Sequence, residues 1–433
     1  METAEILEIL EDWNFWKKGQ ETGIERKEYL QKLDEIGNAG QVIAITGVRR
    51  SGKSTIMRQY IKNLMQNGVK PENILYVNFE DRRFTELSLA LLNKIYDLYL
   101  EHLSPGPKPY ILLDEVHKIE GWEKFARTMH ELGKAKVIVS GSNSKLLSSS
   151  ISSVLTGRHL DMEVYPLDFS EFLMFKGIYL KDRLDILSQR HIIKSALNEY
   201  LKYGGFPLVC LKNMKDELLQ TYFEDIITKD VVERHAVTNI PKLKSLAKFY
   251  LSNAGRRISF NALSKSLGLS LDTVERYSYY LAESYLVSFI KKFSYSVKEQ
   301  ERTQAVVYAV DNGLKNAVGF VFSRDIGWLY QNAIANELMK RHGAEGVFYW
   351  MSVAQEEVDF VVKPKQKVEQ LVQVCYSLEL AETKKKEINA LLKASRELKC
   401  GNLLVITENK EGEEKFGRKK IKYMPLWKWL LKQ

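Results

Sequence analysis

Cysteine is scarce in this sequence: Cys210, Cys375 and Cys400 are spread over 433 residues, and no two of them form a CxxC pair. A disulfide framework and a structural zinc site both need closely spaced cysteines, so the sequence argues against both. Few cysteines are typical of a reducing compartment, and the acidic start METAEILEILEDW does not resemble a signal peptide. We therefore expect a cytoplasmic protein.

Long apolar runs are also missing, since no uninterrupted run approaches the 18 residues of a transmembrane helix. We accordingly expect no membrane partner. The sequence has no internal repeat of fixed period and no low-complexity segment. Its 45% of hydrophobic and 27% of charged residues are ordinary for globular proteins, and a chain of this length can bury more than one core.

The net charge of +9 is unevenly distributed along the chain. Residues 1–239 carry 32 basic and 34 acidic side chains, whereas residues 240–295 carry 9 and 3 and residues 361–433 carry 17 and 9. Two basic blocks in the second half favour a polyanionic partner there, although charge runs are often only solvated surface.

The first part of the chain alternates short β-branched runs with helical patterns, after a stretch at 2–36 that reads as helical. Strands are predicted at 41–47, 74–79, 110–114, 136–141 and 160–167, with helices at 53–66, 85–102, 121–132 and 143–156. The apolar runs are continuous, as in parallel strands buried on both faces. This alternation predicts an α/β fold with a parallel sheet.

The segment GVRRSGKST (47–55) follows an apolar strand and opens a helix, so it predicts a P-loop. Gly47 and Gly52 let the backbone amides point at phosphate oxygens, Lys53 reaches the β- and γ-phosphates, and the Ser54 hydroxyl binds Mg²⁺. The residues expected at ATP are Gly47, Arg50, Ser51, Gly52, Lys53, Ser54 and Thr55, together with Ser142.

The segment YILLDEVH (110–117) supports the same chemistry about sixty residues later. Asp114 stands at a strand end, where a carboxylate can hold Mg²⁺ through water. Glu115 is then placed to polarise the attacking water as a general base.

Two further positions are candidates for the nucleotide site. The next strand ends in VIVSGSN, where Ser140, Ser142 or Asn143 could place a polar group near the γ-phosphate or cap the following helix. Arg158 precedes the fifth strand, where it is either a finger acting on a neighbour's nucleotide or a structural arginine. The finger would require a homo-oligomer, which the sequence does not reveal.

The motifs occur in an order that resembles the prokaryotic AAA+-type ATPases with a C-terminal domain of unknown function, and it is also similar to the archaeal ATPases related to origin-recognition proteins. The segments are ITGVRRSGKST, VNFED, LLDEVHKIEGWE, VSGSNSKLLS, LTGRHLDMEVYPLDFSEFL, YGGFP, DTVERYSYYLAESYLV, YAVDNGL and EEVDFVV. The resemblance implies an ATPase domain (1–167), a helical lid (168–239), a winged helix (240–299) and a nuclease-like domain of the PD-(D/E)xK type (300–433).

The second helix of the expected winged helix, which begins after Ser270 as its N-cap, is poorly equipped to read DNA. It offers Asp272, Glu275 and Glu283 against Arg276 alone. The positive charges lie elsewhere, at Arg256, Arg257, Lys265, Lys291 and Lys292. Non-specific phosphate contact and protein binding both remain open for this region.

The nuclease-like domain retains Asp359, but Gln373 and Cys375 stand where the fold's chemistry needs an acid and a lysine, and Gln331 stands at the expected position of a leading-helix Glu. An amide and a thiol cannot replace a metal-bound carboxylate and an ammonium, so we expect a nuclease-like fold with a degraded site. We expect no nuclease activity after these replacements.

We therefore expect an ATP-hydrolysing, Mg²⁺-dependent AAA+-like protein that associates with DNA through its basic second half. The alternative is a nucleotide-controlled switch or assembly factor that binds protein partners without DNA.

Overall fold

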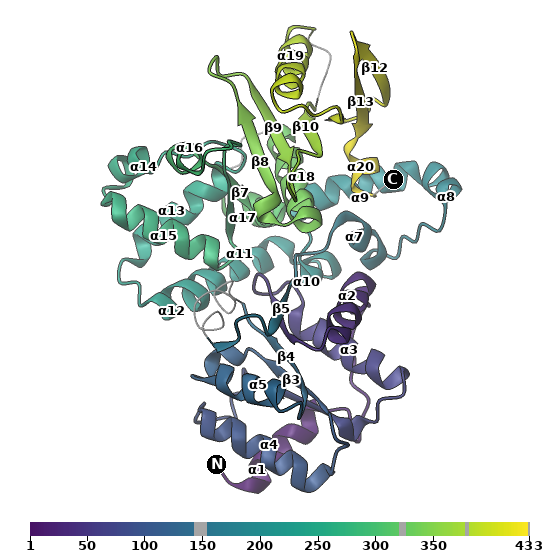
Figure 1. The fold of residues 1–433 in the computed structure, drawn as a ribbon, viewed down its shortest axis with the longest axis vertical. Coiled ribbons are helices and arrows are strands. Elements are labelled where there is room, and N and C mark those ends of the chain that lie inside the picture. The colour runs from purple at the N-terminus through teal and green to yellow at the C-terminus, as the bar shows by residue number, and fades with distance from the viewer. Residues whose placement is uncertain (143–153, 320–325, 377–380, 432–433) are drawn as a thin grey trace. The chain divides into compact units, whose positions relative to one another are not determined.

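The computed structural model describes residues 1–142, 154–319, 326–376 and 381–431 (Figure 1). The chain divides into two compact units, Met1–Val164 and Tyr165–Gln433. The predicted helix at 143–156 lies almost entirely outside the described residues. The four expected domains remain a prediction, and the two units are taken in turn.

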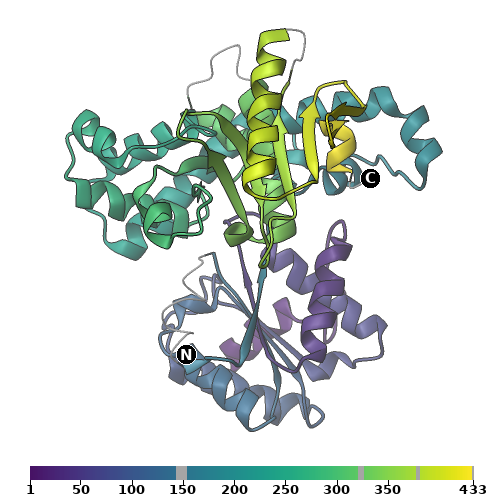
Figure 2. The same cartoon turned by 45° about the horizontal axis from the view of Figure 1, so that its top comes forward.

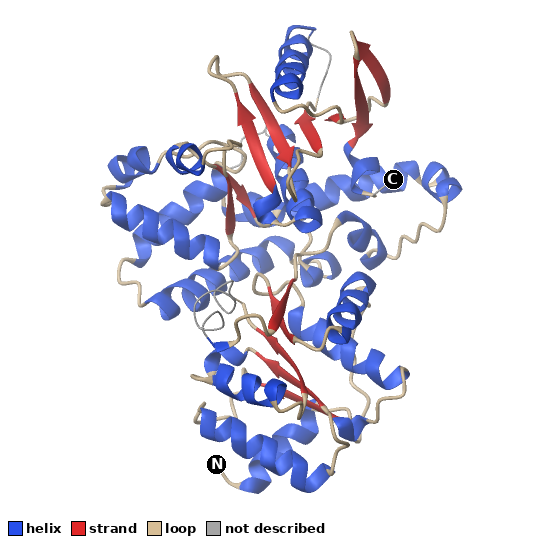
Figure 3. Cartoon of the chain, in the orientation of Figure 1, coloured by secondary structure: helices blue, strands red, loops and turns tan. Residues whose placement is uncertain are grey.

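The first unit contains a five-stranded sheet in the order β2-β3-β4-β1-β5, and every neighbouring pair is parallel (Figure 3). The strands are β1 (Val42–Thr46), β2 (Ile74–Asn78), β3 (Tyr110–Asp114), β4 (Lys136–Ser140) and β5 (His159–Glu163). The predicted parallel α/β sheet is confirmed. Its order places β4 between β1 and β3, so three predicted motifs end at one edge of the sheet.

Successive side chains of each central strand enter two different cores, which explains the continuous apolar runs. Val42 and Ala44 pack with α1 (Thr3–Trp13), α4 (Leu89–Leu103) and α5 (Trp122–Glu131). Ile43 and Ile45 pack instead with α2 (Lys27–Asn38) and α3 (Lys53–Gln66). Figure 2 shows helices on both faces of this sheet.

The single helical stretch predicted at 2–36 is wrong in its middle, because α1 ends at Trp13 and α2 begins at Lys27. Asn14 adopts an extended backbone conformation, and its side-chain amide donates to the Tyr76 carbonyl at 2.9 Å. Its Oδ1 also accepts from the Tyr76 amide at 2.7 Å. Because these bonds pair the side chain with strand β2, they hold the chain outside a helix at this point.

The second unit begins with a mainly helical region. Its helices are α7 (Phe169–Phe175), α8 (Arg183–Ser188), α9 (Arg190–Tyr203), α10 (Pro207–Leu211), α11 (Lys215–Asp225), the π-helix Ile226–Val232, α12 (Glu233–His235), α13 (Ile240–Ser252), α14 (Phe260–Leu267) and α15 (Leu271–Glu283). Ser270 caps α15 as predicted, since its hydroxyl accepts from the Thr273 amide at 3.2 Å. A two-stranded antiparallel sheet follows, formed by β6 (Val287–Ile290) and β7 (Val306–Ala309), with α16 (Val297–Arg302) between them.

The remaining chain forms a six-stranded mixed sheet in the order β12-β13-β11-β10-β9-β8. The strands are β8 (Val347–Met351), β9 (Glu357–Val362), β10 (Gln370–Val374), β11 (Leu403–Thr407), β12 (Gly412–Phe416) and β13 (Lys419–Pro425), and the helices are α17 (Asn312–Val318), α18 (Ile326–His342), α19 (Ala381–Glu397) and α20 (Leu426–Leu430). Two cores cover the sheet: Phe360 and Val372 pack with α18, whereas Val361 and Leu371 pack with α19.

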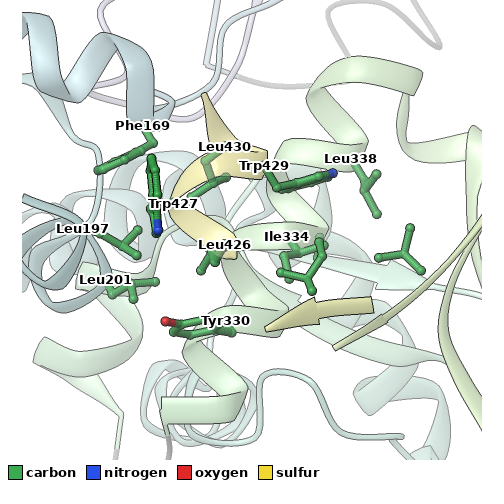
Figure 4. Close-up of a cluster of buried hydrophobic side chains, with 14 of the residues drawn as sticks. Phe169, Leu197, Leu201, Tyr330, Ile334, Leu338, Leu426, Trp427, Trp429 and Leu430 are labelled. Atoms are coloured by element: carbon green, nitrogen blue, oxygen red, sulfur yellow. The ribbon is translucent and has the colours of Figure 1, made fainter. Parts of the chain in front are cut away.

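Helix α20 closes the core on the α18 side of this sheet. Figure 4 shows Leu426, Trp427 and Leu430 among side chains of α9 and α18. The cluster therefore joins the helical region to the six-stranded sheet within the second unit. Among the described residues, no helix has both the length and the apolar character needed to cross a membrane.

Two glycine-rich segments far apart in the sequence, YGGFP (203–207) and VDNGL (310–314), are held together by Asp311. One carboxylate oxygen of Asp311 accepts from the Gly205 amide at 2.7 Å, and the other accepts from the Gly313 amide at 2.8 Å. Gly204 has φ +74°, and a Cβ there would lie 1.9 Å from the Asp311 carboxylate. The close approach therefore requires glycine.

Candidate nucleotide-binding site

The predicted P-loop leaves β1 and enters α3 through a backbone that only glycine tolerates at two positions. Gly47 and Gly52 have φ values of +132° and +104°. A Cβ on Gly47 would lie 2.1 Å from the Val164 carbonyl oxygen, so the loop also packs too closely against the chain after β5 for a side chain. The first amides of α3 have no partner inside the helix and carry its positive dipole end, which suits a phosphate.

Lys53 is the first residue of α3, and its side chain folds back over the loop. The buried Nζ donates to the Gly47 and Val48 carbonyl oxygens at 2.9 and 3.1 Å. The Ser51 hydroxyl is buried and has no hydrogen-bond partner among the described residues. A buried ammonium and an unsatisfied hydroxyl in one loop fit the oxygens of a phosphate chain.

Asp114 ends β3 as predicted and is almost fully buried. Its Oδ2 accepts a hydrogen bond from the Tyr76 hydroxyl on β2 at 2.7 Å, and its Oδ1 accepts from the Ser140 hydroxyl on β4. Both neighbouring strands therefore orient this carboxylate. Together with the Ser54 hydroxyl at the start of α3, it supplies oxygen ligands of the kind that Mg²⁺ prefers.

Glu115 follows in a left-handed backbone conformation, with φ +54°, and its amide donates to the Ser140 hydroxyl at 3.1 Å. Burial raises the pKa of Glu115 to about 7, which the Lys53 ammonium partly opposes. The P-loop lysine is therefore close enough to the predicted base to stabilise its charged form. The carboxyl oxygen Oε2 also lies 3.2 Å from His117 Nδ1.

Three polar residues were predicted as alternatives at the end of β4. Ser140 is buried, accepts from the Glu115 amide and donates to Asp114, so it bridges the two carboxylate residues. Ser142 is also fully buried, whereas Asn143 lies outside the described residues. Ser140 is therefore in direct contact with the predicted magnesium ligand.

Arg158 makes its contacts with other residues. Its Nη2 is 3.0 Å from Glu131 Oε1, and its Nη1 donates to the Thr156 carbonyl at 3.2 Å. Its side chain remains more than one third exposed. Arg50 is exposed as well, whereas Thr55 and Ser54 are half-buried at the start of α3.

Two arginine contacts at the P-loop were missed by the sequence reasoning. Arg49 Nη1 forms an ion pair with Glu80 Oε1 at 3.0 Å, and Arg26 Nη1 donates to the Ser51 carbonyl at 2.9 Å. Glu80 lies in the VNFED motif directly after β2, so its position at a strand end was a usable signal. Arg26 lies in the irregular segment before α2, where no motif or periodicity of the sequence indicates its contact.

The predicted degraded nuclease site is also brought together, on β9, β10 and α18. Gln331 Nε2 donates to Asp359 Oδ1 at 2.8 Å, and the Val374 amide donates to Oδ2 at 2.7 Å. The Asp359 amide donates to Gln373 Oε1 at 3.2 Å. Within the described ranges, no group of three or more His, Cys, Asp or Glu residues is arranged to hold a metal ion.

Three family profiles match successive parts of the sequence. Residues 39–173 match the AAA domain, residues 194–325 match a domain of unknown function (DUF8612), and residues 326–429 match another (DUF4143). The AAA match covers the P-loop and the Asp114–Glu115 pair.

Two sequence relatives extend over most of the chain. An uncharacterized protein of Methanocaldococcus jannaschii is 34% identical over 407 residues, which are 90% of this chain and 88% of the relative. An uncharacterized protein of Haemophilus influenzae is 31% identical over 381 residues, 85% of this chain and 90% of the relative.

Solved structures show weaker likenesses. The Walker-type ATPase of Pyrococcus abyssi is 14% identical with a TM-score of 0.40, covering 71% of this chain and 99% of that one. The Orc1 protein of Aeropyrum pernix, solved in complex with DNA, is 14% identical with a TM-score of 0.30, covering 68% and 92%. Because both TM-scores are below 0.5, neither likeness bears on fold or function.

Proposed function

The chain belongs to the prokaryotic AAA+-type ATPase family, and on that premise we propose that it binds MgATP and hydrolyses it to ADP and phosphate. The observation that carries the proposal is the placement of the P-loop at the end of β1 and of Asp114 and Glu115 at the end of β3, on either side of β4 in the sheet. The P-loop amides and Lys53 would hold the phosphates, while Ser54 and Asp114 would hold Mg²⁺. That ion, when bound, neutralises charge on the phosphates and polarises the γ-phosphoryl group.

Glu115 would orient the attacking water and accept its proton. Because the Glu115 side chain is buried, the attacking water held by it would be shielded from bulk solvent. Ser140 would hold the Glu115 backbone and Asp114 in one arrangement through its two hydrogen bonds. Most of the rate enhancement would then come from positioning and charge stabilisation.

Arg158 is proposed as a finger that acts on the nucleotide of a second copy. Support comes from its partly exposed guanidinium, which is held by a surface ion pair with Glu131 and a hydrogen bond to the Thr156 carbonyl. Such a pair contributes little to stability, so the side chain can be released at small cost. A homo-oligomer is part of this proposal.

We also propose that the second unit associates with DNA through its basic blocks. Arg256 and Lys265 are exposed, and Lys415, Lys420 and Lys422 lie on the exposed face of β12 and β13. Exposed lysines and arginines bind phosphate without reading sequence. On α15, Asp272 pairs with Arg276 at 3.4 Å, which supports the view that this helix does not read the major groove.

The test of the ATPase proposal is steady-state turnover with and without Mg²⁺. Lys53→Ala should abolish nucleotide binding and turnover, whereas Lys62→Ala, an exposed lysine of the same helix, should leave both unchanged. Retained turnover in Lys53→Ala would refute the site.

A second measurement separates DNA association from a protein-directed switch. Affinity for duplex DNA should fall steeply with salt concentration if several phosphates are contacted. Absent or salt-insensitive binding would instead favour the alternative, a nucleotide-controlled switch, which the acidic α15 supports.

A further inference from the structure

The second unit contains a cavity of about 660 Å³ that is distinct from the nucleotide site, and we call it the polar cavity. Its lining includes Arg256, Trp328, Asp359, Lys386 and Glu387 and four glutamines, Gln304, Gln331, Gln355 and Gln373. Its volume is in the range of small-molecule sites, ~300–1,000 Å³. It includes Gln331, Asp359 and Gln373 of the predicted degraded nuclease site, together with residues of α19, which the sequence did not connect with them.

The inner part of the polar cavity carries two carboxylates, Asp359 and Glu387. Asp359 accepts from Gln331 and from the Val374 amide, and Glu387 accepts from the Nε2 of the buried Gln373. No basic side chain of the described residues forms an ion pair with either carboxylate. Burial raises the pKa of Asp359, and repulsion from Glu387 and Glu357 acts in the same direction. Burial also raises the pKa of Glu387, which the Lys386 ammonium partly opposes. The groups are held in place by amides rather than neutralised.

The outer part carries the opposite charge. Arg256 and Lys386 are exposed, and neither forms an ion pair with a described residue. Arg256 instead lies 5.4 Å from the ring centroid of Trp328. Arg257 is engaged with Gln355 and lies near Glu357, at 3.1 and 3.8 Å, so it fixes the wall between the two parts.

This arrangement complements a ligand with two chemically different ends. Hydrogen-bond-donating amino groups suit the inner carboxylates and side-chain amides, and a phosphate suits the outer cations. Trp328 and the four glutamines of the lining form walls for a planar polar ring between these ends. A nucleotide has all three parts.

We propose that the polar cavity binds a single nucleotide unit, with the base toward Asp359 and Glu387 and the phosphate toward Arg256 and Lys386. The unit is either a free nucleoside monophosphate or one unpaired nucleotide of a strand, and the chemistry of recognition is the same. The proposal does not depend on ATP hydrolysis. In its strand form it deepens the proposed DNA association, because it makes an unpaired nucleotide the part that is held.

The experiment uses the full chain with Lys53→Ala, so that the P-loop does not compete for the probes. Isothermal titration calorimetry is run with dAMP, deoxyadenosine and deoxyribose 5-phosphate, and then with a twelve-nucleotide dA strand and an abasic strand of equal length. Binding of dAMP or of the dA strand, and weaker binding of the probes that lack base or phosphate, is expected. If dAMP binds, the source is a free nucleotide; if only the strand binds, the source is nucleic acid.

Paired variants locate the binding. Lys386→Ala and Glu387→Gln should each weaken it about tenfold, on the scale of one lost charged hydrogen bond. Their neighbours on α19 serve as controls: Lys385→Ala and Glu382→Gln change exposed side chains outside the cavity and should have no effect.

Two outcomes would overturn the proposal: no binding of any probe at millimolar concentration, or equal binding by Lys386→Ala, Glu387→Gln and the controls. Either result would leave salt-dependent duplex binding and ATP turnover standing, so failure of this inference is distinguishable from failure of the proposed function.

Discussion

The Ser140 hydroxyl donates a hydrogen bond to Asp114 Oδ1, which joins the ends of strands β4 and β3. Strand β4 also pairs with β1, which leads into the P-loop. Ser140 therefore ends the strand that lies between β1 and β3, the strand that ends in the predicted magnesium ligand. The same hydroxyl accepts from the Glu115 amide at 3.1 Å. One small side chain thus positions both groups that the proposed hydrolysis requires.

Ser140→Ala should lower ATP turnover while leaving nucleotide affinity nearly unchanged. The variant leaves one Asp114 oxygen and the Glu115 amide without this partner, a loss of about 1–3 kcal/mol. If that loss falls on the transition state, turnover drops about 5- to 150-fold. Tyr76→Phe, which removes the bond to the other Asp114 oxygen, is the companion variant. Wild-type turnover in both would contradict the positioning role.

The parallel sheet and the P-loop could be predicted from the sequence because their signals are local. A strand, a glycine turn and a helix follow one another in GVRRSGKST, and Asp114 ends a continuous apolar run. The strand order is not local, so the sequence left Ser140 as one of three alternatives. The structure adds that β4 lies between β3 and β1.

Contacts between distant segments could not be predicted for the same reason. Asp311 binds the Gly205 amide across 106 positions, and Glu387 meets Gln373 from the following helix. Neither contact has a periodic pattern or a fixed spacing in the sequence. The irregular segment after α1 was not predicted, because it depends on the hydrogen bonds of Asn14 to strand β2. Helical periodicity in the sequence carries no information on such a contact.

Gly204→Ala should destabilise the second unit much more than Gly177→Ala. The two glycines have nearly equal φ values, +74° and +75°, so a left-handed conformation costs each alanine about 1–2 kcal/mol. A Cβ on Gly177 meets nothing within 4 Å, whereas one on Gly204 would lie 1.9 Å from Asp311 Oδ1. We expect a further loss of more than about 3 kcal/mol for Gly204→Ala, measured by chemical denaturation. Equal losses of stability in the two variants would contradict this, because they would mean that YGGFP and VDNGL can move apart at no cost.

The free energy of unfolding should fall as the pH rises from about 4 to 6, because Asp311 titrates at different pH values in the folded and unfolded chain. Burial raises its pKa from 3.8 to about 6, although three backbone amides oppose the shift. Between these values the unfolded chain has lost the proton and the folded chain keeps it, so folding is weakened by about 3 kcal/mol across this window. Asp311→Asn removes the titration. The stability difference between wild type and variant should therefore be larger at pH 4 than at pH 7, and a constant difference would contradict the shift.

Arg158 acting in trans predicts complementation between two inactive variants. Arg158→Ala should lower turnover by about 10³-fold, on the scale of arginine fingers, without changing nucleotide affinity. A mixture of Arg158→Ala with Lys53→Ala should recover part of the activity, because one copy keeps the P-loop and the other keeps the arginine. Full activity of Arg158→Ala alone would show that it is only the surface partner of Glu131.

The most direct test of the central claim is single-turnover ATP hydrolysis by Glu115→Gln beside the wild-type chain. The amide keeps the size of the side chain but cannot accept the proton of the attacking water. The account predicts ATP binding within a factor of about two of wild type and hydrolysis slowed by at least about 100-fold, on the scale of a lost general base. Hydrolysis at the wild-type rate would contradict it.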